Sequence, residues 1–341
     1  MKAVRLHRTG GPEVLRLDTV ADPVASPGQV LVRAHSIGVG IADQLVRTGR
    51  YPWMPPLPTV PGIELSGTVA ALGAGVAGLS VGDPVVVSAV DTRGCYAEFL
   101  AADAEWVFPV AAGIDLADAG CLMNYRVAWR ILHAAARVRA GDTVAIVGAA
   151  GGIGSALVQL AKAAGLGVIA LARGSARASF AAALGADHVI DTLHEDLAAR
   201  IAALTGGRGV DLLVDPVAGP DFAGHLDLLA PVGMLVMYGL IEGWPPDAVF
   251  RAQRERMARS PAVRLFSMHA YDGLPDLARE DYARLMALLR DGTIRPAIGA
   301  AFPLGMAAAA HALLDSGAAT GKILLQPGLG AARSSANSAD G

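Results

Sequence analysis

The sequence predicts an α/β protein with two domains, a barrel-like β domain and a domain built on a doubly wound parallel sheet. Its 341 residues are more than the ~150 typical of one domain. Short β-prone runs between Gly- and Pro-containing turns fill residues 1–120, and strands then alternate with helices. These later strands are continuous apolar runs, as expected for a parallel sheet that is buried on both faces.

Composition excludes several classes of protein. Hydrophobic residues make up 53% of the chain and charged residues 17%, which excludes a disordered polypeptide. The net charge of −3 gives no reason to expect a nucleic-acid partner. Cys95 and Cys121 are the only cysteines, so neither a disulfide framework nor a four-cysteine zinc lobe is expected. The amino-terminal residues lack the apolar segment of a secretory signal, and we expect a cytoplasmic protein.

In the first region, turns separate short strands. We expect strands at 2–6, 13–17, 29–39, 67–72 and 83–88. The Pro-rich stretch 51–62 is expected to be an irregular loop.

The second region begins with helical sequence at 116–136 and continues as repeated strand–helix units. Strands are expected at 143–148, 167–172, 188–190, 210–215 and 233–238, with a further candidate at 263–268. Helices are expected at 155–164, 176–184, 193–205 and 222–229. This alternation indicates βαβ crossovers and a parallel sheet.

The last region changes character again. It predicts a helix at 281–290, an extended segment at 293–302, a helix at 306–316 and a strand at 322–326. We interpret it as a return to the first domain, which then comprises 1–120 and 270–330, with the second domain at 121–269. The small, polar residues 331–341 are expected to be disordered.

Residues 143–161 carry no charge and are long enough to suggest a membrane span. Glycines at 148, 151, 152 and 154 instead divide a β-branched run from a helix-like run. A strand, a tight turn and a helix therefore fit this segment better, and no membrane span is expected.

This strand–turn–helix carries a variant of the dinucleotide fingerprint G-x-G-x-x-G. The matching positions are Ala149, Gly151 and Gly154, with alanine in place of the first glycine. The helix start offers free N–H groups to a pyrophosphate. The residues expected to bind it are Ala150, Gly151, Gly152, Ile153 and Gly154. The alternative is an ordinary glycine-rich turn.

The end of the second strand of this unit distinguishes the cofactors. An acidic residue there would bind the ribose 2′-hydroxyl of NAD, but the sequence has Arg173, Ser175 and Arg177. Guanidinium and hydroxyl groups suit a 2′-phosphate, so NADP(H) is expected. The alternative is that both arginines only solvate a helix start.

Several blocks give the chain a family resemblance. They are GVGIADQLVRTGRYP, LPTVPGIELSGTVAALGAGV, NYRVAW, VGAAGGIGSALVQLAKAAG, GGRGVDLLVDPVAG and GKILLQPG. Over about residues 1–327 the chain resembles zinc-independent medium-chain dehydrogenases/reductases of the quinone oxidoreductase group. LMNYRVAWRIL and ARLMALLRDGTIRPAI resemble a subgroup that includes vesicle amine transport protein 1-like reductases.

The resemblance implies a GroES-like β-barrel domain, a Rossmann domain and NADPH bound between them. It also implies a homodimer formed through the edge strands of the Rossmann sheets, for which 263–268 is the matching segment. Zinc-dependent relatives have Cys and His where this chain has Gly40 and Ile63, and only Glu64 remains. Catalytic zinc needs three protein ligands, so no metal is expected.

The resemblance also indicates candidate site residues. Tyr51 matches a proposed proton donor, and Asn124 is placed near the nicotinamide. Gly239 and Lys322 are candidate cofactor contacts. For each of these residues a packing, helix-start or strand-end role is the alternative. Two positions depart from the family pattern: Val127 replaces a usual Thr, and Gly40 replaces the Asn of many quinone oxidoreductases.

Without a Lewis acid, reduction of an already electrophilic acceptor is expected rather than alcohol oxidation. The leading hypothesis is therefore an NADPH-dependent reductase of a small quinone or α,β-unsaturated carbonyl. A non-catalytic NADPH-binding sensor or interaction protein on the same fold is the second hypothesis. A zinc alcohol dehydrogenase is a third and weaker one.

Overall fold

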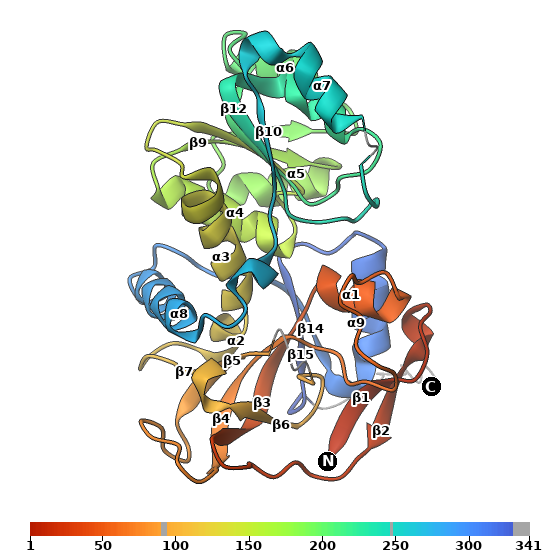
Figure 1. The fold of residues 1–341 in the computed structure, drawn as a ribbon, viewed down its shortest axis with the longest axis vertical. Coiled ribbons are helices and arrows are strands. Elements are labelled where there is room, and N and C mark those ends of the chain that lie inside the picture. Colours follow the sequence, from red (N-terminus) through yellow and green to blue (C-terminus); the bar gives the residue numbers. More distant parts are fainter. Residues whose placement is uncertain (90–93, 246–247, 330–341) are drawn as a thin grey trace, which may run out of the picture. The chain divides into compact units, whose positions relative to one another are not determined.

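The computed structural model describes residues 1–89, 94–245 and 248–329, and the chain forms two compact units (Figure 1). Unit 1 comprises Met1–Pro109, Ala301–Gly317 and the chain from Ile323, and unit 2 comprises Val110–Ala300 and Ala318–Lys322. The predicted disordered tail, 331–341, lies outside the described residues.

Unit 1 is built on antiparallel β-structure. Strands β1 (Lys2–Leu6) and β2 (Leu15–Thr19) pair with each other. The larger sheet has the order β14-β15-β3-β4-β5-β7, and β6 also pairs with β3. Its strands are β3 (Gln29–Val39), β4 (Glu64–Leu72), β5 (Pro84–Ser88), β6 (Phe99–Asp103), β7 (Val107–Pro109), β14 (Ile298–Pro303) and β15 (Lys322–Gln326). The expected strands are present, but the one expected at 13–17 lies at 15–19, after a 3-10 helix at Pro12–Val14, and the segment expected to be extended at 293–302 is a strand only from 298. Strands β6 and β7 were not predicted.

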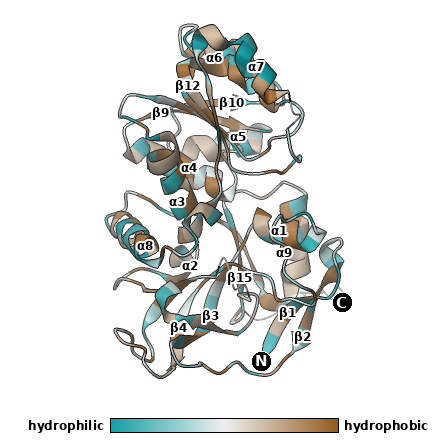
Figure 2. Cartoon of the chain, in the orientation of Figure 1, coloured by the Kyte–Doolittle hydropathy of each residue, from teal (hydrophilic) through white to brown (hydrophobic). Residues whose placement is uncertain are grey.

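Unit 2 contains a six-stranded parallel sheet in the order β10-β9-β8-β11-β12-β13. The strands are β8 (Thr143–Val147), β9 (Gly167–Ala172), β10 (His188–Asp191), β11 (Val210–Asp215), β12 (Leu229–Met237) and β13 (Ala262–Leu265). Strand order reverses between β8 and β11, the place where ligands bind in doubly wound sheets. The expected Rossmann-type sheet is confirmed. Figure 2 shows the apolar character of the sheet in the largely brown strand β12. The helix α7 (Val249–Glu255) is by contrast largely teal, which marks hydrophilic residues.

Helices connect these strands close to where they were expected. They are α4 (Gly152–Ala163), α5 (Ser175–Ala183), α6 (Leu197–Leu204) and the 3-10 helix at Phe222–Leu228. Helix α6 begins four residues later than predicted because the Asp196 carboxylate accepts from the Ala199 N–H at 2.9 Å and caps it there. The predicted helix 116–136 is divided into α2 (Leu116–Ala119), α3 (Leu122–Trp129) and a π-helix (Arg130–Ala136). Helix α7 was not predicted.

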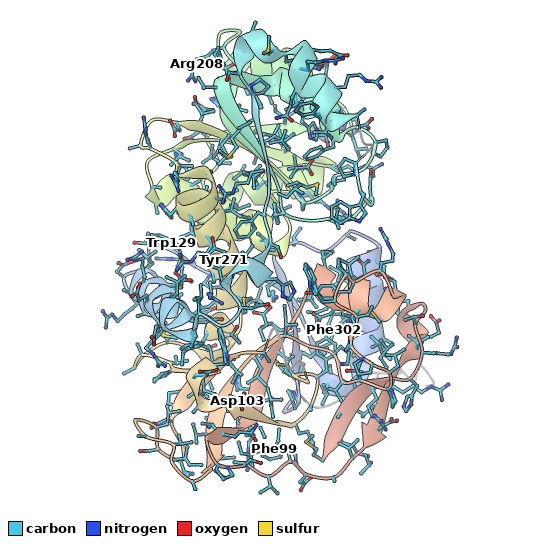
Figure 3. The ribbon with its side chains drawn as sticks, viewed as in Figure 1. Phe99, Asp103, Trp129, Arg208, Tyr271 and Phe302 are labelled. Carbon is cyan, nitrogen blue, oxygen red and sulfur yellow. The ribbon has the colours of Figure 1, made fainter. Side chains whose placement is uncertain are left out.

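Residues 270–300 group with unit 2, whereas the sequence analysis assigned them to the first domain. A buried ion-pair cluster accounts for this. Asp281, on α8 (Pro275–Arg290), accepts from the Nε atoms of Arg126 and Arg130 at 3.1 and 2.8 Å. The Arg130 guanidinium also lies 5.2 Å from the ring centroid of Tyr271, which is labelled in Figure 3. Two arginines, one on α3 and one on the π-helix that follows it, therefore hold α8 to unit 2.

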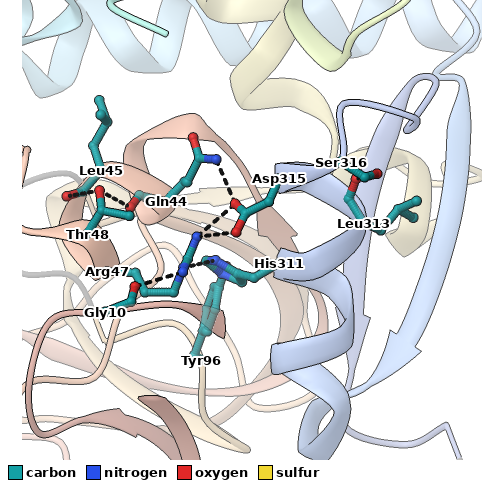
Figure 4. Close-up of polar contacts among 10 residues, drawn as sticks. All are labelled: Gly10, Gln44, Leu45, Arg47, Thr48, Tyr96, His311, Leu313, Asp315 and Ser316. Carbon is teal, nitrogen blue, oxygen red and sulfur yellow. Dashed lines mark hydrogen bonds and ion pairs between the residues drawn. The ribbon is translucent and has the colours of Figure 1, made fainter. Parts of the chain in front are cut away.

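A buried polar chain organises unit 1 (Figure 4). Arg47, on α1 (Ile41–Thr48), is 1% exposed, and its NH2 lies 2.7 Å from both carboxylate oxygens of Asp315. Its Nε donates to Nδ1 of His311 at 3.2 Å, and its NH1 donates to the Gly10 carbonyl at 2.8 Å. Nε2 of His311, on α9 (Ala307–Asp315), lies 3.0 Å from the Tyr96 hydroxyl. The chain thus joins α1, α9 and two loops.

This buried group of polar residues predicts that the protein becomes less stable at acid pH. Burial, reinforced by the charge of Arg47, lowers the pKa of His311 from 6.5 to about 4. The unfolded state then binds more protons between these two values, so stability falls as the pH drops from about 6.5 to about 4, by a few kcal/mol at most. Denaturation series at stepped pH should show a smaller loss over this window for His311→Gln. Equal slopes for both proteins would contradict a neutral native His311.

Candidate functional site

The turn between β8 and α4 is packed so closely that it requires glycine. Gly148 has a φ of 67°, and its carbonyl accepts from the Gly151 N–H at 2.9 Å. A Cβ on Gly154 would lie 2.1 Å from that carbonyl oxygen and 2.8 Å from the Cα of Ala149. The first turn of α4 therefore lies directly against the turn that precedes it.

This packing makes the start of α4 a candidate anion site. Ala150–Gly154, the segment expected to bind a pyrophosphate, spans the turn and the first helical residues. The first N–H groups of a helix have no partner within it, and the helix dipole is positive at this end. A cradle of glycines at the end of a parallel strand fits the diphosphate of a dinucleotide.

Asn124 and Lys322 lie beside this turn although they are 198 residues apart in sequence. Nζ of Lys322 donates to Oδ1 of Asn124 at 3.3 Å, and both side chains are buried. A Cβ on Gly152 would lie 2.5 Å from Nδ2 of Asn124. The N–H of Gly321 donates to the Ala150 carbonyl at 2.8 Å. The structure thus brings together the glycine turn, α3 and the start of β15.

Arg173, Ser175 and Arg177 stand where the second strand of the sheet meets its helix. Arg173 follows β9 directly, and Ser175 and Arg177 lie in the first turn of α5. Arg173 and Ser175 are exposed, and Arg177 is half-buried. Within the described residues, neither guanidinium has a carboxylate at ion-pair distance. These cations remain available to an external anion.

Sequence reasoning missed one residue at this edge. The Asp191 carboxylate, at the end of the neighbouring strand β10, accepts from the Gly174 N–H at 2.7 Å. Gly174 lies between Arg173 and Ser175, so this carboxylate contacts the backbone of the predicted 2′-phosphate site. The sequence did contain a signal for this residue. Asp191 is an acidic residue directly after the predicted strand 188–190, whereas only the end of the preceding strand, 167–172, was considered.

Gly239 lies just after β12 and is required by packing. A Cβ there would lie 2.4 Å from the Pro216 carbonyl oxygen. The nearby Asp215 is fully buried, and its carboxylate accepts from the Val217 N–H at 2.6 Å and lies 3.0 Å from Nδ1 of His225. The loops that follow β11 and β12 are therefore held close together at the carboxyl edge of the sheet.

Tyr51 belongs to unit 1, whereas the residues above belong to unit 2. It follows α1, which ends at Gly49 in the left-handed conformation, and its N–H donates to the Leu45 carbonyl at 3.1 Å. Its ring makes an edge-to-face contact with Trp53, with centroids 5.7 Å apart. The loop that carries Tyr51 is thus tied to the helix that contains Arg47.

Asp43 has a structural role in unit 1. It is 1% exposed, and its carboxylate accepts from the N–H groups of Gly40 at 3.0 Å and Gly62 at 3.1 Å.

Residues 1–89, 94–245 and 248–329 contain no group of three or more His, Cys, Asp or Glu side chains arranged to hold a metal ion. No helix in the described part of the chain is long and apolar enough to cross a membrane.

Comparisons with known proteins agree with this fold. The alcohol dehydrogenase GroES-like domain model matches residues 26–130, and a zinc-binding dehydrogenase model matches residues 184–325. Rat quinone oxidoreductase is 30% identical over 328 residues, covering 95% of this chain and 97% of the relative. The human synaptic vesicle membrane protein VAT-1 homolog is 32% identical, covering 96% and 87%.

Solved structures extend the match. Escherichia coli quinone oxidoreductase, complexed with NADPH, has a TM-score of 0.90 and is 27% identical. The match covers 96% of this chain and 100% of the E. coli chain. A mycobacterial protein complexed with NADPH has a TM-score of 0.89 and 32% identity, with the same coverage. The chain is thus a medium-chain dehydrogenase/reductase by fold. It belongs to the quinone oxidoreductase family, as the sequence blocks predicted.

The close packing of the glycine turn can be tested directly. We expect Gly154→Ala to lower the free energy of unfolding by about 1–3 kcal/mol, since a backbone oxygen cannot yield to the new Cβ and the loss exceeds the gain in helix propensity. Gly224→Ala is the control, because a Cβ there meets no atom within 4 Å. Chemical denaturation measures both, and a Gly154→Ala protein as stable as the wild type would contradict the packing argument.

Proposed function

We propose that the protein is an NADPH-dependent reductase that transfers hydride to a quinone or an α,β-unsaturated carbonyl compound. The observation that carries the proposal is the glycine turn at the start of α4, together with two arginines after the neighbouring strand β9 that have no carboxylate partner among the described residues. Family membership and two solved relatives complexed with NADPH support the choice of cofactor.

In this proposal the bound cofactor supplies the hydride, and the chain's own residues bind and orient it. N–H groups of Ala150–Gly154, other than that of Gly151, which donates to the Gly148 carbonyl, hold the diphosphate. Arg173, Ser175 and Arg177 hold the 2′-phosphate. Asn124, fixed by Lys322, orients the nicotinamide end, and the backbone at Gly239 contacts the cofactor at the sheet edge. Tyr51 donates a proton to the reduced acceptor, which completes a two-electron reduction.

The donor set argues for chemistry without catalytic zinc. Gly40 and Ile63 stand where zinc-dependent relatives have Cys and His, and neither residue can bind a metal through its side chain. The proposed acceptors are already electrophilic and need no Lewis acid for hydride attack. A non-catalytic NADPH-binding protein is the competing function.

A panel of quinones and enones tests the proposal, with NADPH consumption followed by its absorbance and metal content measured on the same sample. We expect turnover with at least one acceptor and less than stoichiometric zinc. Tight NADPH binding without turnover of any acceptor would favour the sensor hypothesis. Zinc bound at one ion per chain would contradict the zinc-free mechanism.

We also propose a homodimer formed through β13. This strand lies at the edge of the six-stranded sheet, and Leu265 on it is 63% exposed. An exposed apolar edge strand is a surface on which a second sheet can pair. Sedimentation analysis should show a dimer, and a monomer at micromolar concentration would contradict this proposal.

Cofactor preference should depend on the two arginines. The double variant Arg173→Ala/Arg177→Ala should weaken NADPH binding by about ten- to a hundredfold while NADH binding changes little, since only NADPH carries the 2′-phosphate. Titration calorimetry with both cofactors measures this. Arg16→Ala, at an exposed position on β2 in unit 1, is the control. Equal losses for NADPH and NADH would refute the assignment.

The proposed proton donor gives a separate test. Tyr51→Phe keeps the ring that packs on Trp53 and removes only the hydroxyl. We expect kcat to fall by about 10²-fold or more with the affinity for NADPH unchanged. Unchanged kcat would assign Tyr51 a packing role.

A further inference from the structure

Asp191 lies at the edge of the sheet where the 2′-phosphate is proposed to bind. Strands β9 and β10 are parallel, and their register places Asp191 opposite Ala172, the residue before Arg173. Asp191 therefore lies at the end of β10 that is next to the segment carrying the three proposed phosphate ligands, Arg173, Ser175 and Arg177.

Hydrogen bonds hold this carboxylate in place. Oδ1 accepts from the N–H groups of Gly174 at 2.7 Å and Leu193 at 3.0 Å. Oδ2 lies 2.8 Å from Nδ1 of His194. The hydrogen bond from His194, followed by those from Gly174 and Leu193, holds the pKa of Asp191 below its ordinary value, so the group is ionised at neutral pH.

Within the described residues, His194 is the group that pairs with the Asp191 carboxylate, and no arginine or lysine lies at ion-pair distance from it. Oε1 of Glu195 accepts from the backbone N–H of Asp191 at 2.8 Å, and Glu195 itself pairs with Arg200 at 2.7 Å. The Arg173 and Arg177 side chains form no ion pair with Asp191. The edge therefore carries a carboxylate fixed to the backbone between Arg173 and Ser175, where the two guanidiniums have no ion pair within the described part of the chain.

We propose that Asp191 is a specificity-determining residue that weakens the preference for NADPH over NADH. Its charge repels a dianionic 2′-phosphate. It does not repel a neutral 2′-hydroxyl, from which a carboxylate can accept a hydrogen bond. Both effects favour NADH, whereas the arginines favour NADPH. The inference rests on the proposed cofactor site and adds an opposing charge to it.

The test is the binding of NADPH and NADH to Asp191→Asn, measured by titration calorimetry without an acceptor. Asparagine keeps an oxygen that accepts from Gly174 and Leu193 and removes the charge. We expect NADPH to bind about three- to tenfold more tightly at low salt, with NADH unchanged or weaker. The gain should shrink at high ionic strength, which a purely structural effect would not do.

Two further variants sharpen the test. Asp187→Asn is the matched control, since Asp187 accepts from the Val168 N–H at 2.8 Å and pairs with Lys162 but precedes β10, at the opposite end of the strand. It should leave the ratio of the two affinities unchanged. His194→Lys, at an exposed position, leaves the backbone contacts of Asp191 intact and places a permanent cation beside it, so it should also tighten NADPH.

The outcomes separate this inference from the proposed function. If the wild type binds NADPH and Asp191→Asn leaves the affinity ratio unchanged, or changes both affinities equally, the role of Asp191 is refuted and the cofactor site stands. If the wild type binds neither cofactor, the proposed function fails as well.

Discussion

The candidate site depends on one packing constraint, the contact between the first turn of α4 and the backbone of the turn before it. Only a glycine at 154 allows this approach, because any Cβ would overlap the Gly148 carbonyl. The contact directs the free N–H groups at the start of α4 toward the carboxyl edge of the sheet. Asn124 and Lys322 are then placed by a neighbouring contact, in which an amide nitrogen fills the space that a side chain at Gly152 would need. We attribute the proposed anion-binding character of the site to backbone packing.

Unit 1 is held together by buried polar interactions rather than by close backbone packing. Its helices α1 and α9 are held by the buried chain of Tyr96, His311, Arg47 and Asp315, in which a fully buried guanidinium has donors satisfied by two side chains and a backbone carbonyl. A buried charge is tolerated only when it is paired and hydrogen-bonded in this way. The loop that carries Tyr51 follows α1 directly, so these buried interactions also restrict the position of that loop.

The strands at 29–39, 167–172, 210–215 and 322–326 could be predicted to the residue, since each is an uninterrupted β-prone run between turn residues. The glycine turn could be predicted because its motif is local. Strand β7 is too short to show a period. Gly120 ends α2 and was a local signal of the first break in 116–136, whereas the change from α3 to a π-helix follows from no local signal. The grouping of α8 with unit 2 and the pairing of Lys322 with Asn124 join residues more than a hundred positions apart, and only the tertiary structure reveals them.

We propose that this chain binds NADPH with the diphosphate at the start of α4 and the 2′-phosphate between Arg173 and Arg177. A crystal structure of the complex with NADPH tests that claim most directly. We predict the diphosphate within hydrogen-bond distance of the Gly151–Gly154 backbone and the 2′-phosphate on the two guanidiniums. A cofactor bound with its 2′-phosphate in solvent, or away from α4, would contradict it.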